Sequence, residues 1–249
     1  MSAILQLDRV SRRFGGLLAV DQASFALEAG EIVGLIGPNG AGKTTLVNVI
    51  TGVHRATGGQ VRFEGRRIEH LKSHRISRMG IARTFQVVQP FPRMTVLENV
   101  AAGALFAGHS RNPREARHQA EEHLEFVGLQ GEKHQSASAL TLAGRKRLEL
   151  AKSLAMRPRL LLLDEVNAGL NPTEIDAALD LIRAIAARGI TIVVIEHLMR
   201  VVLNVCTRVV VLHHGALIAD GAPREVVADR QVIEAYLGKR YASALEDSA

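Results

Sequence analysis

One loop pattern constrains this chain more than any other feature. Residues Gly37 to Thr44 match G-x-x-x-x-G-K-T, and Thr45 follows directly. The apolar, β-branched run 31–36 before the loop predicts a buried parallel strand, and residues 45–50 after it can form a helix. Glycines in such a loop let backbone N–H groups turn toward phosphate oxygens, and the helix N-terminus adds partial positive charge. In this context the pattern predicts a nucleotide site rather than a chance glycine-rich turn.

The residues of this loop have distinct expected roles. Lys43 would reach the β- and γ-phosphates, and the Thr44 hydroxyl would hold Mg²⁺. The predicted nucleotide-binding residues of the loop are Gly37, Pro38, Asn39, Gly40, Ala41, Gly42, Lys43, Thr44 and Thr45. Phe14, which precedes the loop, is the candidate for stacking on adenine, and a phenylalanine packed at a turn is the alternative.

Composition narrows the class of protein. The 249 residues suit one large α/β domain or a core with a modest insert, and 47% hydrophobic residues supply a sizeable core. Aromatic residues make up only 4%, which argues against stacking surfaces for single-stranded nucleic acid. The single cysteine, Cys206, favours a reducing compartment and a buried packing role. We expect no signal peptide and no membrane span, and the net charge of +6 does not by itself choose a partner.

The secondary structure that the sequence favours changes in the middle of the chain. Strand-like runs occupy the first part, including 4–10, 19–27 and 81–86, and a surface helix is expected over 70–79. Helix formers dominate from residue 96 to about residue 157, and the helix after Gly144 is expected to turn Leu148, Leu150 and Leu154 inward. Strand-like runs then return, and an amphipathic helix is expected over 176–188. We therefore predict a nucleotide-binding core of 1–87 and 158–230, a helical subdomain of 88–157, and a C-terminal helix and tail of 231–249.

Polar side chains follow the predicted buried strands. Asp164 and Glu165 end the run 160–163, and His197 follows the run 190–195 by one glutamate. In open α/β sheets ligands bind beyond the carboxyl ends of the strands. Asp164 is thus a candidate magnesium carboxylate acting through water, and Glu165 a candidate general base. A second metal-shell acid or a strand-capping glutamate is the alternative for Glu165, and His197 is placed to reach a γ-phosphate.

Taken together, these motifs resemble the ATP-binding cassette ATPases. The resemblance rests on the phosphate loop, Gln86 before the helical insert, 160–165, Asn171 and His197, and it extends over nearly the whole chain. It implies an α/β P-loop NTPase fold, an ATP-binding cassette with a mixed-sheet core and an inserted α-helical subdomain. It also implies ATP and Mg²⁺ as ligands. Gln86 would sense Mg²⁺ and couple to a transmembrane partner, and His197 would contact the γ-phosphate.

The family works as a nucleotide-sandwich dimer, in which a signature segment of one subunit closes the ATP site of the other. That segment usually has a serine and two glycines followed by glutamine, and here it reads Leu140-Thr141-Leu142-Ala143-Gly144. Thr141 keeps a hydroxyl, Ala143 adds a methyl group, and Gly144 lacks the glutamine side chain. We expect these three residues to close the partner's site with altered efficiency. Asn171 replaces a frequent aspartate and leaves a polar contact across the dimer possible.

Finer resemblance points to one subfamily. The segments 80–86, 168–174 and 195–197 are similar to cassettes for uptake of branched-chain and other hydrophobic amino acids. This implies a second, different cassette, with a homodimer as the alternative. It also implies two permease subunits, a substrate-binding protein acting indirectly, and a peripheral location on the cytoplasmic face of the inner membrane. Cassettes for urea or amide import and for lipopolysaccharide export are the neighbouring alternatives.

Two readings from other classes compete with a transport motor. A soluble cassette ATPase acting on nucleic acid or ribosomes would fit the net charge of +6. Such proteins typically have two cassettes or a coiled-coil arm, and this chain has one phosphate loop and little room between Gln86 and Leu140. We therefore expect no nucleic acid partner. A regulatory module without hydrolysis is favoured by the unusual signature segment and opposed by intact Lys43, Asp164, Glu165 and His197.

Overall fold

The computed structural model describes residues 3–85, 90–108, 110 and 112–237, which form two compact units. The first unit draws on 1–72 and 191–249, and the second is 73–190. The chain has the mixed α/β fold predicted from the sequence, with parallel and antiparallel strand pairs. The predicted boundaries at residues 88 and 157 stay a prediction.

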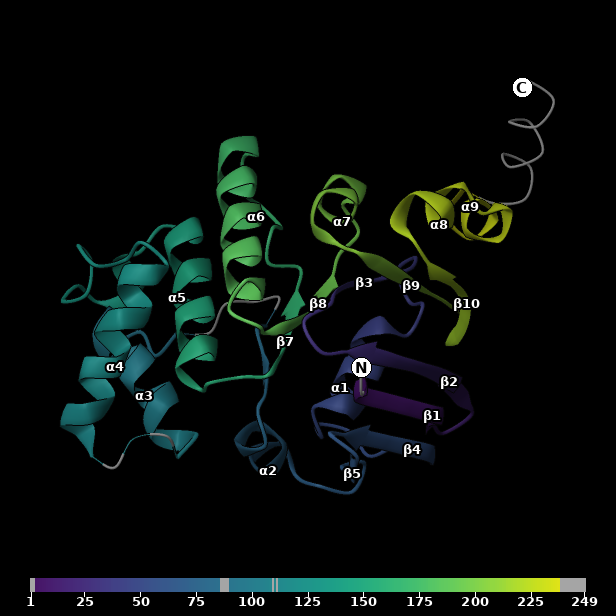
Figure 1. Ribbon diagram of the computed structural model, residues 1–249, viewed down its shortest axis with the longest axis horizontal. Coiled ribbons are helices and arrows are strands. Elements are labelled where there is room, and N and C mark those ends of the chain that lie inside the picture. Colours follow the sequence, from purple (N-terminus) through teal and green to yellow (C-terminus); the bar gives the residue numbers. More distant parts are fainter. Residues whose placement is uncertain (1–2, 86–89, 109, 111, 238–249) are drawn as a thin grey trace. The chain divides into compact units, whose positions relative to one another are not determined.

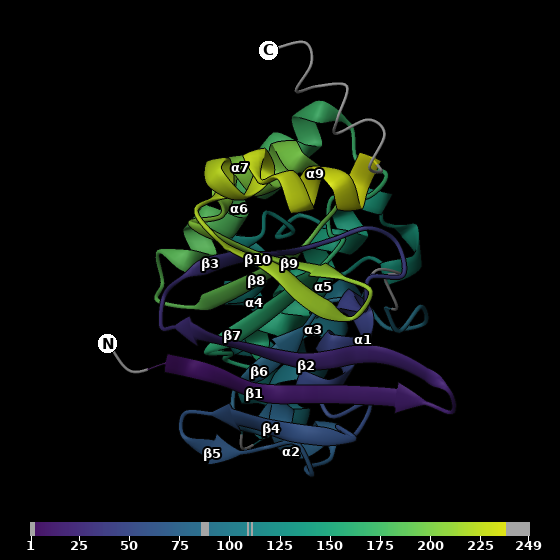
Figure 2. The ribbon, with the colours of Figure 1, turned by 90° about the vertical axis from the view of Figure 1, so that its right-hand side faces the viewer.

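An antiparallel sheet begins the first unit. Its strands are β1 (Ala3–Phe14), β2 (Leu17–Glu28), β4 (Gly58–Phe63) and β5 (Arg66–Arg67). They pair in the order β2-β1-β4-β5, as the purple and blue strands in Figure 2 show. β1 is longer than the predicted run 4–10, so Phe14 ends a strand instead of following one at a turn.

The remaining strands of the first unit carry the phosphate loop. They are β3 (Ile32–Ile36), β8 (Thr191–Ile195), β9 (Arg208–His213) and β10 (Ala216–Gly221). β3 pairs in parallel with β8 on one side and β9 on the other, and β10 pairs antiparallel with β9. Every residue of β3 and β8 is buried, which is typical of parallel strands with a largely β-branched, apolar sequence.

Helices complete the first unit. They are α1 (Lys43–Ile50), α7 (Met199–Val205), α8 (Pro223–Ala228) and α9 (Arg230–Leu237). The sequence predicted α1 and α9 but not α7 or α8. α7 packs close to β3 because Gly34 has no side chain: a Cβ there would lie 3.2 Å from both Cys206 Sγ and Val202 Cγ1.

The second unit combines a parallel strand pair with helices (Figure 1). Its elements are α2 (Ser73–Arg78), β6 (Ile81–Arg83), α3 (Val96–Phe106), α4 (Pro113–Phe126), the 3₁₀ turn Ala137–Ala139, α5 (Leu142–Ala155), β7 (Leu160–Asp164) and α6 (Pro172–Ala186). α3, α4 and α5 pack against one another and confirm the predicted helical region. The structure shortens the predicted strand 81–86, since β6 ends at Arg83, and shortens the predicted helix 70–79, since α2 begins at Ser73.

We predict that Cys206 is unreactive in the folded protein. Burial, together with the negative charge of Glu196, raises the pKa of Cys206 to about 12. At about pH 8 its thiolate fraction should be lower than that of an ordinary cysteine by on the order of a thousandfold. Labelling with an aromatic disulfide reagent should therefore require denaturant and then consume one equivalent. Rapid labelling in native buffer would contradict the buried position.

Candidate active site

The phosphate loop leaves β3 through backbone conformations that only glycine adopts easily. Gly37 has φ 148° and Gly42 has φ 105°. A Cβ on Gly37 would overlap the carbonyl oxygen of Leu212, and one on Gly42 would overlap that of Ala19. The two glycines are therefore required both by conformation and by close contact with neighbouring strands.

Backbone hydrogen bonds fix the middle of the loop. Gly215, in the turn between β9 and β10, donates its N–H to the Ala41 carbonyl at 2.9 Å. The Gly215 carbonyl in turn accepts the Asp21 N–H at 2.8 Å. Ala41 also donates to the Pro38 carbonyl at 3.1 Å, so the loop is held in one shape by segments far away in the sequence.

The helix that follows the loop is well suited to bind an anion. α1 has Gly42 as its N-cap, without a side-chain cap and without an acidic residue in its first turn. The first bond into the helix runs from the Leu46 N–H to the Gly42 carbonyl at 2.9 Å, and the preceding N–H groups of a first turn have no acceptor within a helix. Lys43 Nζ lies across the loop, donating to Gly37 and Pro38 carbonyls at 2.7 and 3.1 Å. This donor set fits a polyphosphate.

Two aromatic residues of the first unit concern the predicted nucleotide site. Phe14 is the candidate for stacking on adenine, and Tyr236 lies near Gly37 of the loop. Phe14 is 38% exposed, and the Arg12 guanidinium lies 4.3 Å above its ring. A base stacking on Phe14 would therefore need ring surface that Arg12 does not cover. Tyr236 of α9 has a buried hydroxyl near the Gly37 amide: burial raises the pKa of Tyr236, and that backbone N–H opposes the shift.

His197 follows the end of β8 in the same unit. Its neighbour Glu196 is fully buried, and His197 itself is exposed. The imidazole of His197 is therefore accessible to a ligand. Within the first unit the structure brings together the loop residues 37–45 and supplies His197 from an adjoining parallel strand.

Asp164 ends β7 in the second unit and is 4% exposed. Its Oδ2 accepts a hydrogen bond from Arg83 Nη2 at 2.6 Å, and its N–H donates to Thr84 Oγ1 at 3.2 Å. The carboxylate is thus buried and paired with a cation. The sequence pattern does not predict this contact, because the Arg83 side chain reaches a residue 81 positions away.

Glu165 directly follows β7 in an unusual backbone conformation. Its φ is +48°, a left-handed value that is uncommon outside glycine. Lys146 of α5 is 7% exposed, and its Nζ donates to the Glu165 carbonyl at 3.3 Å and to the Ala168 carbonyl at 2.6 Å. This buried amine holds the turn that carries Glu165, and nothing in the sequence pattern singled it out.

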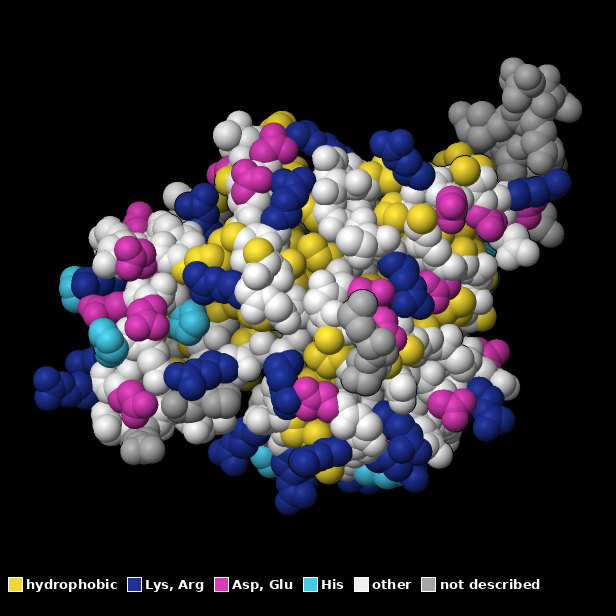
Figure 3. All heavy atoms as spheres, viewed as in Figure 1, with side chains coloured by type: hydrophobic (Ala, Val, Ile, Leu, Met, Phe, Trp, Pro, Cys, Tyr) yellow, Lys and Arg dark blue, Asp and Glu magenta, His cyan; other side chains and the backbone are white. Residues whose placement is uncertain are grey.

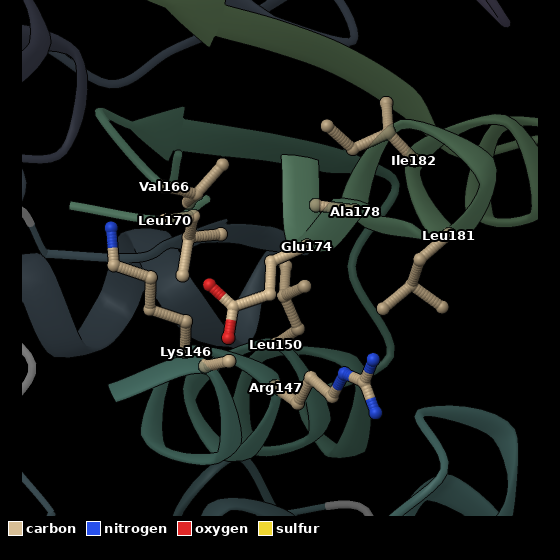
Figure 4. A pocket seen from close by; sticks show the side chains of 10 residues that line it. Lys146, Arg147, Leu150, Val166, Leu170, Glu174, Ala178, Leu181 and Ile182 are labelled. Atoms are coloured by element: carbon tan, nitrogen blue, oxygen red, sulfur yellow. The ribbon is translucent and has the colours of Figure 1, made fainter. Parts of the chain in front are cut away.

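Beside Lys146 lies a small cavity between α5 and α6 (Figure 4). It has a volume of about 20 Å³, room for roughly one water molecule. Its lining is mainly apolar, with Leu150, Val166, Leu170 and Ile182 among the side chains. The cavity belongs to the packing of the signature helix and is too small for a nucleotide.

The signature segment forms the start of α5. Thr141 is its N-cap, and Oγ1 accepts the Gly144 N–H at 3.1 Å. A Cβ on Gly144 would lie 3.3 Å from Leu140 Cβ, so packing is tight at the position where the family has glutamine. Ala143 lies in the first turn. The expected inward side chains Leu148, Leu150 and Leu154 are all buried, which confirms the predicted helix.

Asn171 has a structural role that the sequence reasoning missed. Its Oδ1 accepts the Glu174 N–H at 3.0 Å, and its own N–H donates to Glu174 Oε2 at 2.9 Å. With Pro172 at the first helical position, this capping box starts α6 at 172 instead of the predicted 176. The sequence signal for this helix start is the spacing of Asn171, Pro172 and Glu174.

The predicted site residues are thus distributed over both units. The first contains Phe14, the loop 37–45 and His197, and the second contains Asp164, Glu165 and the signature residues 141–144. Gln86 lies outside the described residues. Among the residues that the structure describes, no group of three or more His, Cys, Asp or Glu side chains could hold a metal, and no helix is long and apolar enough to cross a membrane.

Comparison with known families gives two matches. The family described as ABC transporter matches residues 20–168, and the family described as branched-chain amino acid ATP-binding cassette transporter matches residues 216–242. The first match extends from β2 to the turn after β7. The second contains β10 and α8 and extends past the last described residue.

Individual relatives match over almost their full length. The chain is 40% identical to the high-affinity branched-chain amino acid transport ATP-binding protein BraF of Pseudomonas aeruginosa, over 95% of this chain and 98% of BraF. It is 39% identical, with the same coverage, to the corresponding protein LivG of Escherichia coli K12. A crystal structure of an ATP-binding cassette of an ABC transporter, in its ADP conformation, superposes with a TM-score of 0.87 at 32% identity, covering 96% of this chain and all of that one.

We predict that Lys146→Met destabilises the second unit, because the methionine fills a similar volume but leaves two partly buried carbonyls without their ammonium donor. The free energy of unfolding should fall by about 1–3 kcal/mol, measured by urea denaturation. Arg183→Ala, which removes an exposed ion pair with Asp180, is the matched control and should change stability by less than about 0.5 kcal/mol. Equal effects of both changes would show that Lys146 is dispensable for the turn.

Proposed function

The chain belongs to the ATP-binding cassette ATPases of the ABC transporter family, and from this premise we propose that it drives uptake of branched-chain or other hydrophobic amino acids across a membrane. The amino acid specificity of the transporter is supported by the relatives' names and by the C-terminal match over residues 216–242. Selection of the amino acid itself would belong to partner proteins.

The observation that best supports ATP binding and hydrolysis is the backbone conformation of the phosphate loop. Gly37 and Gly42 adopt conformations that a side chain would obstruct, and α1 begins without a side-chain cap. Lys43 adds a cation directly over the loop carbonyls. Binding the β- and γ-phosphates would exchange those carbonyl contacts of Lys43 for charge-assisted ones. The chain's own groups therefore orient the nucleotide before any chemistry occurs.

We assign metal binding to Thr44, Asp164 and Gln86. A hydroxyl and a single carboxylate are suitable protein donors for Mg²⁺, which usually keeps several waters and substrate oxygens as its other ligands. Mg²⁺, when bound, would neutralise charge on the phosphate oxygens and help to orient them. Asp164 is suited to this role because its carboxylate stands at the end of a buried strand, where ligands bind in open α/β sheets.

The hydrolytic step is assigned to Glu165 and His197. Glu165 would accept a proton from the attacking water, and His197 would donate a hydrogen bond near the γ-phosphate. Lys146 stabilises the left-handed backbone conformation at Glu165, and this conformation fixes the position from which the Glu165 side chain extends. Thr141, Ala143 and Gly144 would close the site of a second cassette, with the N-terminus of α5 directed at its phosphates.

The proposed partners are a second cassette and two permease subunits, with a substrate-binding protein acting indirectly at the other side of the membrane. We assign the permease contact to the segment 87–100, which follows Gln86 and which the structure describes from residue 90 onward. Asn99 is fully buried and accepts the Phe91 N–H at 2.8 Å, and Phe91 itself is 48% exposed. A fixed turn with an exposed phenylalanine suits a protein partner. The chain would then work peripherally on the cytoplasmic face of the inner membrane.

The distribution of surface charge supports a nucleic acid partner less than the other observations support transport. Cationic side chains gather over β4 and β5, where Arg62, Arg66 and Arg67 are exposed (Figure 3). Arg67 pairs with buried Glu69, with its Nε 2.7 Å from Oε1, so part of this charge is neutralised. Carboxylates are interspersed with cations over the rest of the visible face. We therefore retain the transport proposal alone.

Glu165→Gln should bind ATP and accumulate as a closed dimer, because it keeps the site's shape but cannot accept a proton. We expect steady-state ATP hydrolysis to fall at least about a hundredfold. Phosphate release measures turnover, and light scattering measures the dimer. Glu125→Gln, a change at an exposed glutamate of α4, should behave as the original protein. Normal turnover in Glu165→Gln would remove the base assignment.

The transport proposal predicts which chains copurify with this one. Tagged Glu165→Gln protein, taken from ATP-loaded and detergent-solubilised native membranes, should retain two permeases and a second cassette. Adding Phe91→Asp should release the permeases, because it places a charge on the proposed contact, while ATP binding remains. Recovery of the Glu165→Gln protein alone, or with ribosomes, would contradict the transport proposal.

A further inference from the structure

Arg83 and Asp164 form a buried ion pair at the ends of two neighbouring strands. Arg83 is the last residue of β6, and Asp164 is the last residue of β7. The Arg83 Nη2 and Asp164 Oδ2 atoms are 2.6 Å apart, and the two side chains are only 9% and 6% exposed. Solvent and salt therefore screen this pair much less than a pair on the surface.

The strands hold both members of the pair in place. β6 and β7 are parallel, with Arg83 opposite Leu162. The Thr84 N–H donates to the Leu162 carbonyl at 2.9 Å, and Thr84 Oγ1 accepts the Asp164 N–H at 3.2 Å. These bonds connect the chain on either side of the ion pair, so its geometry is part of the fold and not an accident of two flexible side chains.

A carboxylate buried in this way is costly unless a cation or hydrogen-bond donors compensate its charge. The proposed role of Asp164 brings Mg²⁺ to the same carboxylate. Two cations at one carboxylate repel each other, strongly so where solvent is scarce. Arg83 must therefore either weaken metal binding or give up its contact with Asp164.

Arg83 has a second surface within reach. Its guanidinium carbon lies 5.3 Å from the centroid of the Phe85 ring, which is 50% exposed. An aromatic face attracts a guanidinium group, so Arg83 can lean onto Phe85 when it leaves the carboxylate. Phe85 is followed directly by Gln86, the residue proposed to sense the metal.

We propose that Arg83 is a positioning residue that neutralises Asp164 in the metal-free protein and yields it to Mg²⁺ when the nucleotide complex binds. The inference rests on the proposed role of Asp164 as a metal carboxylate. Arg83 keeps the end of β7 from holding an uncompensated charge, and it opposes metal binding. Its displacement also links arrival of the metal to the segment that leads to Gln86.

The test is the dependence of ADP affinity on Mg²⁺. Calorimetry gives the ADP dissociation constant with saturating Mg²⁺ and with a chelator. The constant with chelator divided by the constant with Mg²⁺ measures how strongly the metal assists ADP binding. Formation of Mg-ADP in solution is the same for every variant and cancels in the comparison. We expect Arg83→Gln to increase this ratio by about tenfold, and Arg83→Lys to increase it by about threefold, because lysine keeps the charge without the planar fork.

Two further variants separate the possible failures. Arg159→Gln changes an arginine at the opposite end of the same strand pair, where its Nη2 donates to the Met79 carbonyl at 2.6 Å, and it should leave the ratio unchanged. Asp164→Asn should abolish the Mg²⁺ response. If it does so while Arg83→Gln leaves the ratio unchanged or lowers it, the inference about Arg83 is wrong and the proposed function stands.

A normal Mg²⁺ response in Asp164→Asn would instead overturn the metal role of Asp164 and the inference with it. If Arg83→Gln does not fold, Arg83→Lys tests the proposal in its place. An unchanged or lowered ratio in Arg83→Lys would equally contradict competition between Arg83 and Mg²⁺ for the Asp164 carboxylate.

Discussion

Buried strands that end in polar groups impose the main constraint on this structure. β3 leads into the phosphate loop, β7 into Asp164 and Glu165, and β8 into Glu196 and His197. Strands buried along their whole length must deliver these groups to a surface without leaving a buried charge or carbonyl uncompensated. Each unit meets the requirement with contacts from distant segments: Gly215 for the loop, Arg83 for Asp164, and Lys146 for the turn at Glu165.

The same contacts connect the proposed catalytic residues to the signature helix and to the strand that precedes Gln86. Lys146 lies on the signature helix and holds carbonyls on both sides of the turn after β7. Arg83 lies on the strand that leads toward Gln86 and holds the carboxylate of β7. A change at the signature segment or near Gln86 therefore has a direct physical route to Asp164 and Glu165 within one unit.

Several sequence predictions were confirmed, and the errors have identifiable causes. The runs 160–163 and 190–195 correctly predicted β7 and β8, because a short continuous apolar sequence is typical of strands buried on both faces. α7 was missed because Val201, Val202 and Val205 have low helix propensity, and packing beside Gly34 outweighs that preference. The start of α6 was misplaced because the capping box at Asn171 went unread.

The sequence by itself determined the fold class, the phosphate loop and the identity of the polar groups at the strand ends, because glycine spacing and hydrophobic runs are local signals. It could not determine what compensates those groups. Arg83, Lys146 and Gly215 are ordinary residues in their local sequence, and they matter because the fold brings them to partners far along the chain. The stability of a buried charge depends on which cation lies a few ångströms away, and only tertiary structure decides that distance.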